Sequence, residues 1–125
     1  MDMRGYQRYR EEPLNTMTQG ELLLLVYDEL VKRLKQAGME LDRENYTAFD
    51  EAVDRAEKII RYLSDTLDRK YAISGDLSRL YEYFCYELSR VKAGRNRTEL
   101  ERVTKMVSEL RDSFRQAEKS AASGR

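Results

Sequence analysis

Hydrophobic residues recur at intervals of three and four along most of this 125-residue chain, which is the period of amphipathic α-helices. The densest stretch is residues 22–27, an unbroken apolar run that ends in Tyr27. At about 100° per residue, such a run wraps more than half of a helix, so one narrow face cannot hold it. We therefore expect this helix to be covered on more than one side, either by its own bundle or by a partner.

The first predicted helix covers residues 19–41. Thr18 and Glu21 have the spacing of a capping box at its start. Leu22 and Leu25 fall outside the inward stripe, on the side of the helix that also carries charged residues. The positions that form the stripe are Leu23, Val26, Tyr27, Leu30, Leu34, Ala37 and Leu41.

The second predicted helix has the most regular apolar period, over residues 49–67, and either Asn45 or Thr47 can cap its start. The third is predicted over residues 76–92. Gly94 is a natural residue for its C-terminal cap, because glycine accepts the left-handed conformation without a Cβ penalty. Between these two helices, the connector lacks a helical pattern but carries apolar side chains, which we expect to cover an end of the bundle.

A fourth helix is predicted to open at Thr98, which has the capping-box spacing with Glu101. Four amphipathic segments with short connectors and no strand pattern predict an all-α fold, an antiparallel up-and-down four-helix bundle. We place this bundle at residues 18–119. It follows a short N-terminal arm, residues 1–17, and precedes a small polar tail, residues 120–125, which we expect to be disordered.

The amino-acid composition limits the kinds of ligand and the kinds of site that we expect in this protein. Lys plus Arg and Asp plus Glu both number 23, and this balance disfavours binding to nucleic acid or to anionic lipid. No apolar run approaches the roughly 20 residues of a membrane span, and no secretory signal pattern opens the sequence, so we expect a soluble cytoplasmic protein. The chain has no histidine and only one cysteine, Cys85. Metal and haem sites in helical bundles depend on histidine, so we expect no enzyme, no catalytic residue, no metal and no cofactor.

The chain has nine tyrosines and no tryptophan, which is a high tyrosine content for a helical bundle. Tyrosines outside the core stripes can simply lie along the surface with the hydroxyl in water. Together with the surplus leucines, they also fit an apolar groove that binds an amphipathic segment of a partner, or a second copy of the chain. The candidate partner-binding residues are Tyr6, Tyr9, Leu14, Met17, Leu22, Leu25, Tyr62, Tyr71, Ile73, Tyr83, Tyr86 and Met106.

Short motifs along nearly the whole chain resemble the flagellin-specific secretion chaperones, the FliS family. Residues 14–22 are similar to the family's arm-to-helix pattern, and residues 25–28, Leu-Val-Tyr-Asp, to its Met-Leu-Tyr-Asp/Asn. Residues 80–83, Leu-Tyr-Glu-Tyr, and residues 110–114, Leu-Arg-Asp-Ser-Phe, follow in the family's order. Departures include Gln19 in place of the usual proline, and phenylalanine in place of tryptophan at the end of the last motif.

The resemblance implies a cytoplasmic chaperone that binds the disordered C-terminal segment of flagellin, prevents premature polymerisation and delivers the subunit to the type III export gate. We hypothesise that the N-terminal arm occupies part of the binding groove in the free protein. The alternative is a self-associating structural bundle, a homodimer without a flagellin client. A metal-binding bundle is a third and remote alternative.

Overall fold

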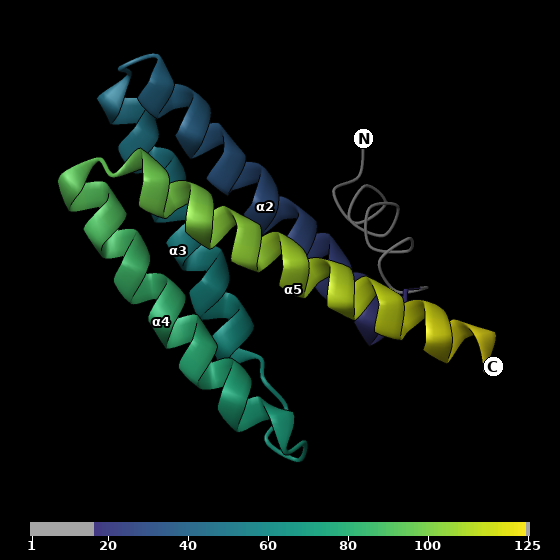
Figure 1. The fold of residues 1–125 in the computed structure, drawn as a ribbon. Helices are drawn as coiled ribbons and strands as arrows, with labels where there is room; N and C mark the ends of the chain where they lie inside the picture. Colours follow the sequence, from purple (N-terminus) through teal and green to yellow (C-terminus); the bar gives the residue numbers. More distant parts are fainter. Residues whose placement is uncertain (1–16, 125) are drawn as a thin grey trace, which may run out of the picture.

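A computed structural model describes residues 17–124. Its helices are α2 (Gln19–Asp42), α3 (Tyr46–Asp65), α4 (Ile73–Gly94) and α5 (Arg97–Ser123), joined by short connectors (Figure 1). The described part of the chain contains no β-strand. The predicted all-α four-helix bundle is therefore confirmed.

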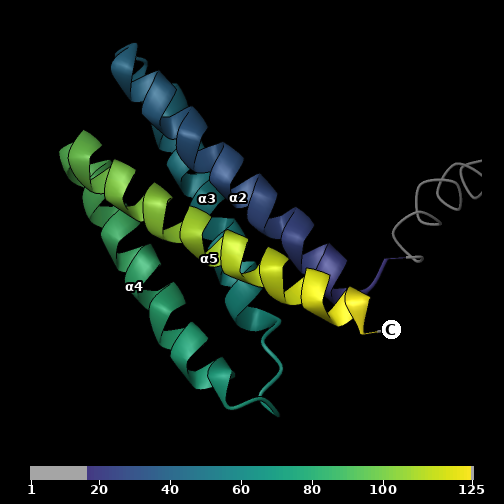
Figure 2. The ribbon, with the colours of Figure 1, turned by 45° about the vertical axis from the view of Figure 1, so that its right-hand side comes forward.

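The four helices form a ring in which each one packs on the next. α2 packs on α3 and α5, and α4 packs on the other sides of α3 and α5, with the least contact between α4 and α5. Both tight turns, between α2 and α3 and between α4 and α5, lie at one end of the bundle (Figure 1). We call this the closed end. At the opposite end the helices diverge, and the longer α3–α4 connector lies away from the start of α2 and the end of α5 (Figure 2).

Side-chain caps fix the starts of α2 and α3. The hydroxyl of Thr18 accepts a hydrogen bond from the backbone N–H of Glu21 at 3.1 Å, as the capping-box pattern predicted. At α3 the cap is Asn45, whose side chain accepts from the backbone N–H of Ala48 at 3.3 Å. Asn45 and Thr47 were both possible from the sequence, and Asn45 takes the role.

The last two helices differ from their predicted limits. α4 begins at Ile73 and so includes residues that the sequence pattern placed in the connector. Its last residue is Gly94, and the residue in the left-handed conformation that caps it is Arg95, at φ 50°, so the prediction of Gly94 as the cap was wrong. α5 begins at Arg97, because Asn96 caps it by accepting from the N–H of Glu99 at 3.0 Å. The capping box predicted at Thr98 was wrong, since this residue already lies in the first turn.

α5 is also longer than its apolar pattern predicted. It runs to Ser123, into the stretch whose composition predicted a disordered tail. Its buried residues, Leu100, Val103 and Val107, all lie in the half towards the closed end. Further along, Leu110 and Phe114 keep the same period but are only partly buried. The core is therefore complete at the closed end and incomplete where the helices diverge.

Two glycines on α2 lie next to side chains of α5. A Cβ on Gly38 would lie 3.1 Å from the guanidinium carbon of Arg97, which forms an ion pair with Asp42 at 3.0 Å. A Cβ on Gly20 would overlap the carboxylate of Glu118. The absence of a side chain at these two positions leaves room for the long side chains of Arg97 and Glu118, which reach from α5 to the two ends of α2.

Candidate partner-binding cleft

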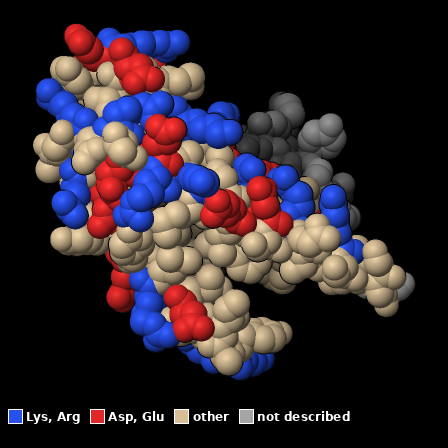
Figure 3. Space-filling view, viewed as in Figure 1, with Lys and Arg blue, Asp and Glu red and all other residues tan. Residues whose placement is uncertain are grey.

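A cleft of about 580 Å³ lies where the helices diverge. One side is the first half of α2 with the second half of α5, and the other is the end of α3 with the start of α4. Figure 3 shows a hollow between these two sides with a largely uncharged surface, whereas Lys, Arg, Asp and Glu crowd the closed end. The open end therefore presents a largely apolar concave surface within the size range of ligand-binding clefts.

Apolar side chains from all four helices line this cleft. Most of them continue the inward stripes beyond the point where the opposing helix has moved away. The apolar lining consists of Leu22, Leu23, Val26, Tyr62, Leu63, Leu67, Tyr71, Leu77, Tyr81 and Phe114.

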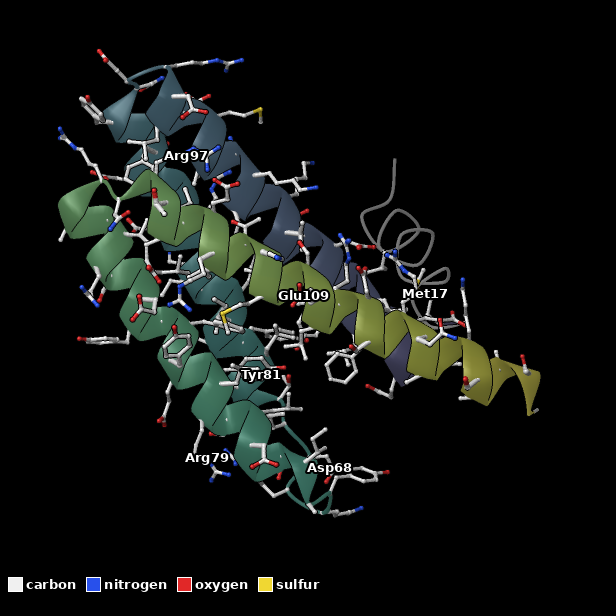
Figure 4. The ribbon with its side chains drawn as sticks, viewed as in Figure 1. Met17, Asp68, Arg79, Tyr81, Arg97 and Glu109 are labelled. Carbon is white, nitrogen blue, oxygen red and sulfur yellow. The ribbon has the colours of Figure 1, made fainter. Side chains whose placement is uncertain are left out.

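The polar lining is confined to few positions. Gln19 and Gly20 lie at the start of α2, and Thr66 and Asp68 follow the end of α3. Asp68, labelled in Figure 4, belongs to the connector between α3 and α4. This distribution gives a mostly apolar interior with a few polar groups, which is the usual composition of a ligand-binding cleft.

Two tyrosine hydroxyls hydrogen-bond to each other at the base of the cleft. Tyr27 of α2 and Tyr81 of α4 are both buried, and their hydroxyls bond across the centre of the bundle. The ring of Phe114 stacks on Tyr27 with 5.3 Å between ring centroids. Burial raises the pKa of both phenols, and the mutual hydrogen bond raises the pKa of Tyr27 further. Both groups are therefore neutral at physiological pH.

A shallower groove of about 390 Å³ runs between α2 and α3 on the adjoining face. Leu25 and Ile59 form its apolar surface, with Glu29 and Lys58 at its edges. Val26 and Tyr62 border both this groove and the cleft, so the two apolar surfaces are continuous across them. The apolar surface of the cleft thus extends onto the face between α2 and α3.

The structure brings four of the predicted residues together here. Leu22, Tyr62 and Tyr71 line the cleft, and Leu25 lines the adjoining groove. Leu25, Tyr62 and Tyr71 are 46 %, 56 % and 65 % exposed, which is high for large apolar side chains. The bundle therefore leaves exposed apolar surface concentrated at its open end.

Two more predicted residues lie near this end without lining the cleft. Ile73 is exposed at the first position of α4. Met17 is half-buried just before α2 and is labelled in Figure 4. The predicted residues Tyr6, Tyr9 and Leu14 lie outside the described residues.

Tyr83, Tyr86 and Met106 belong to a different face, formed by α4 and α5. Tyr83 is half-buried, and its hydroxyl accepts a hydrogen bond from Arg102. Met106 packs against the core. Tyr86 is exposed, with the guanidinium carbon of Arg90 5.9 Å from its ring centroid. None of the three lines the cleft, so the structure does not join them to the other candidates.

The sequence-based site also omitted residues that line the cleft. Leu23, which was predicted on the inward stripe of its helix, is one of them, and the others are Leu63, Leu77, Tyr81 and Phe114. All five belong to the core or pack against it. Their periodicity is the same as that of the fully buried core positions. What exposes them to the cleft is the divergence of the helices, and a single-helix pattern carries no signal for it.

The remaining chemistry in the described part of the chain is sparse. Burial raises the pKa of the Cys85 thiol, which keeps it protonated and weakly nucleophilic at neutral pH. Residues 17–124 contain no group of three or more acidic or cysteine side chains placed to hold a metal ion. No helix in this range has an apolar stretch long enough to cross a bilayer.

Fold and site together define a small all-α bundle with an apolar cleft at one end, a class suited to binding a segment of another chain. The model of the family described as Flagellar protein FliS matches residues 2–121, and the chain belongs to this family. It is 28% identical over 112 residues to the Flagellar secretion chaperone FliS of Bacillus subtilis (strain 168), covering 90% of this chain and 84% of that protein.

A solved structure described as a flagellar chaperone from bacteria has the same fold. It aligns with a TM-score of 0.78, at 19% sequence identity, over 96% of this chain and 99% of the solved one. The resemblance seen in the short motifs is thus confirmed at the level of the family and of the fold.

Proposed function

We propose that this protein is a cytoplasmic flagellar export chaperone that binds the C-terminal segment of flagellin in the apolar cleft and the adjoining α2–α3 groove. Binding would keep that segment from polymerising before export and would present the subunit to the export gate. The observation that carries the proposal is the incomplete core at the open end. The family membership supplies the kind of client.

Physical chemistry supports this form of binding. A disordered segment has to be ordered when it binds, and buried apolar area must offset that loss of entropy. Leu22, Leu25 and Tyr62 offer such area in one continuous strip, whereas charged residues dominate the closed end (Figure 3). Tyrosine adds a large contact area at a low rotamer cost.

Calorimetric titration with a peptide of the flagellin C-terminal segment tests the proposal. We expect saturable binding of one peptide per chain and a negative heat-capacity change, the mark of apolar burial. A peptide of the same composition in scrambled order is the control. Absence of binding by the flagellin peptide, or equal binding by the scrambled one, would contradict the proposal.

A homodimer is the competing function, since the exposed apolar strip could also pair with a second copy. Light scattering on a size-exclusion column, with and without the flagellin peptide, separates the two. The proposal expects a 1:1 complex with the peptide. A stable homodimer whose mass does not change with the peptide would favour the structural role.

The N-terminal arm is the third element of the proposed function. The arm, residues 1–17, comes shortly before Gln19 and Gly20 in the sequence, and these two residues line the cleft. The proposed arrangement has the arm compete with the client for part of the same surface. Removal of residues 1–13 would then raise the affinity for the flagellin peptide, and an unchanged affinity would count against the competition.

A further inference from the structure

A single charged side chain is found among the described residues that line the cleft. It belongs to Asp68, in the connector between α3 and α4, and Figure 4 labels it at that end of the cleft. Apolar contact has no preferred direction, so the rest of the lining discriminates weakly between bound segments of similar hydrophobicity. A charge on such a surface favours ligands that carry the opposite charge at the matching position.

The connector holds the Asp68 carboxylate in place. Its Oδ1 accepts a hydrogen bond from the backbone N–H of Lys70 at 3.0 Å. The backbone carbonyl of Asp68 accepts another from the N–H of Tyr71 at 3.2 Å, which closes the turn. Because the turn already orders the side chain, a ligand that binds the carboxylate has little further entropy cost to offset at this residue.

The second carboxylate oxygen of Asp68 has no partner within residues 17–124. Arg69 and Lys70 follow directly in the sequence, yet neither of their side chains forms an ion pair with Asp68 in this range. A carboxylate can accept about four hydrogen bonds, and the Lys70 N–H uses one of them. Since Asp68 is exposed, the other positions are open to a donor that arrives with a ligand.

Asp68 differs in this respect from two other acidic residues of the open end. Asp28 of α2 forms an ion pair with Arg115 at 3.0 Å, and Glu118 of α5 accepts a hydrogen bond from Thr18 at 3.1 Å. Those contacts join α2 to α5, so their carboxylates already serve the fold. A cation that arrives at Asp68 does not have to displace another side chain of the described residues.

We propose that Asp68 forms an ion pair with a basic side chain, lysine or arginine, of the segment bound in the cleft. This inference rests on the proposed binding of the flagellin segment there. The apolar lining supplies most of the affinity, and the ion pair at one end fixes which residue of the segment lies at that end. Segments with a lysine or arginine at this position bind better than segments with a neutral residue there.

Two asparagine variants and a set of peptides isolate this contact. Asp68→Asn removes the charge but keeps an oxygen that can accept from the Lys70 N–H, so the turn is retained. Asp65→Asn is the matched control, because Asp65 is an exposed carboxylate at the end of α3 that does not line the cleft. The ligands are the flagellin C-terminal peptide and versions of it in which each lysine or arginine is replaced in turn by methionine. Calorimetry measures each affinity at low and at high salt.

At low salt, Asp68→Asn is expected to bind the unaltered peptide about fivefold more weakly than wild type, which is the upper range for a solvent-accessible ion pair. The difference should shrink in about 1 M salt, because dissolved ions screen the attraction. One methionine peptide should lose the same factor with wild type and nothing more with Asp68→Asn, since both changes remove the same contact. Asp65→Asn should bind every peptide like wild type.

Three results would overturn the inference while the proposed function stands. The first is wild-type affinity in Asp68→Asn. The second is an equal loss in Asp65→Asn, because the effect would then come from the general charge of this end of the molecule. The third is a loss in Asp68→Asn that no methionine peptide shares, because the partner would then not be a basic side chain. If wild type itself fails to bind the unaltered peptide, the proposed function fails instead.

Discussion

At the scale of single residues, the Tyr27–Tyr81 pair joins α2 to α4 across the bundle, and these are helices that are not neighbours in the ring. Tyr27 was predicted to lie on the inward stripe of its helix, and both side chains are buried. The sequence did not reveal that the two hydroxyls meet, because helix periodicity gives the direction of a side chain but not its height in the bundle. The contact between the two hydroxyls could therefore be found only from the structure.

Alkaline titration is the first prediction at this scale. The folded state raises the pKa of Tyr27 and Tyr81 above the unfolded value of about 10. The folded state therefore holds protons that the unfolded state loses, and the free energy of unfolding falls as pH rises above about 10. The fall should reach about 1.4 kcal/mol per pH unit for each phenol.

Urea unfolding between pH 9 and 11 measures this dependence. The Tyr27→Phe/Tyr81→Phe double variant removes both titrating groups and should lose stability less steeply over the same range. If the free energy of unfolding fell equally steeply with pH in wild type and in the double variant, the raised pKa of the two phenols would be contradicted.

The two glycines of α2 give a second prediction. Gly38→Ala should raise the free energy of unfolding by about 0.5–1 kcal/mol, because alanine favours the helix and the flexible Arg97 guanidinium needs to move only slightly. Gly20→Ala should give no gain, because its Cβ displaces the Glu118 carboxylate that accepts from Thr18. Urea unfolding of both variants measures the difference. An equal rise in the free energy of unfolding for Gly38→Ala and Gly20→Ala would contradict this explanation.

At the scale of elements, the sequence predicted all four helices and most of their inward faces. The prediction of a helix end was correct where a local sequence pattern determines that end, as at Thr18, whose hydroxyl caps α2. The prediction of a helix end was wrong where two neighbouring residues can both cap the helix. Asn96 and Thr98 can each cap α5, and the structure uses Asn96. Ile73 lies in a stretch with no regular period, yet α4 begins there.

The cap of α2 yields the prediction at this scale. The Thr18 hydroxyl accepts from the Glu21 N–H and donates to Glu118 at 3.1 Å, so it ties the start of α2 to α5. Thr18→Ala should lower the free energy of unfolding by about 1–2 kcal/mol. Thr18→Ser retains the hydroxyl and is the control. The amide hydrogen of Glu21 should exchange faster in Thr18→Ala but not in Thr18→Ser, because only the alanine variant loses the cap. Equal exchange at Glu21 in both variants would contradict the role of the Thr18 hydroxyl as the cap.

At the scale of the whole molecule, the decisive feature is that the helices diverge at one end. Leu22 and Leu25 were predicted as surplus apolar surface, and they do line the cleft and the adjoining groove. Tyr83 and Tyr86 had the same kind of signal but lie on the α4–α5 face. Surplus apolar residues thus indicated a binding surface without fixing its place, because the angles between helices depend on all four packing faces together.

Tyr62 and Met39 allow the most direct test of the account. Both are exposed large side chains in helices, at 56 % and 51 %, so an aspartate at either position should leave the fold intact. Only Tyr62 borders the cleft and the adjoining groove. In calorimetric titration with the flagellin C-terminal peptide, Tyr62→Asp should bind at least about tenfold more weakly than wild type, and Met39→Asp should bind like wild type. Wild-type affinity in Tyr62→Asp, or an equal loss in Met39→Asp, would contradict the claim that the open end is the binding site.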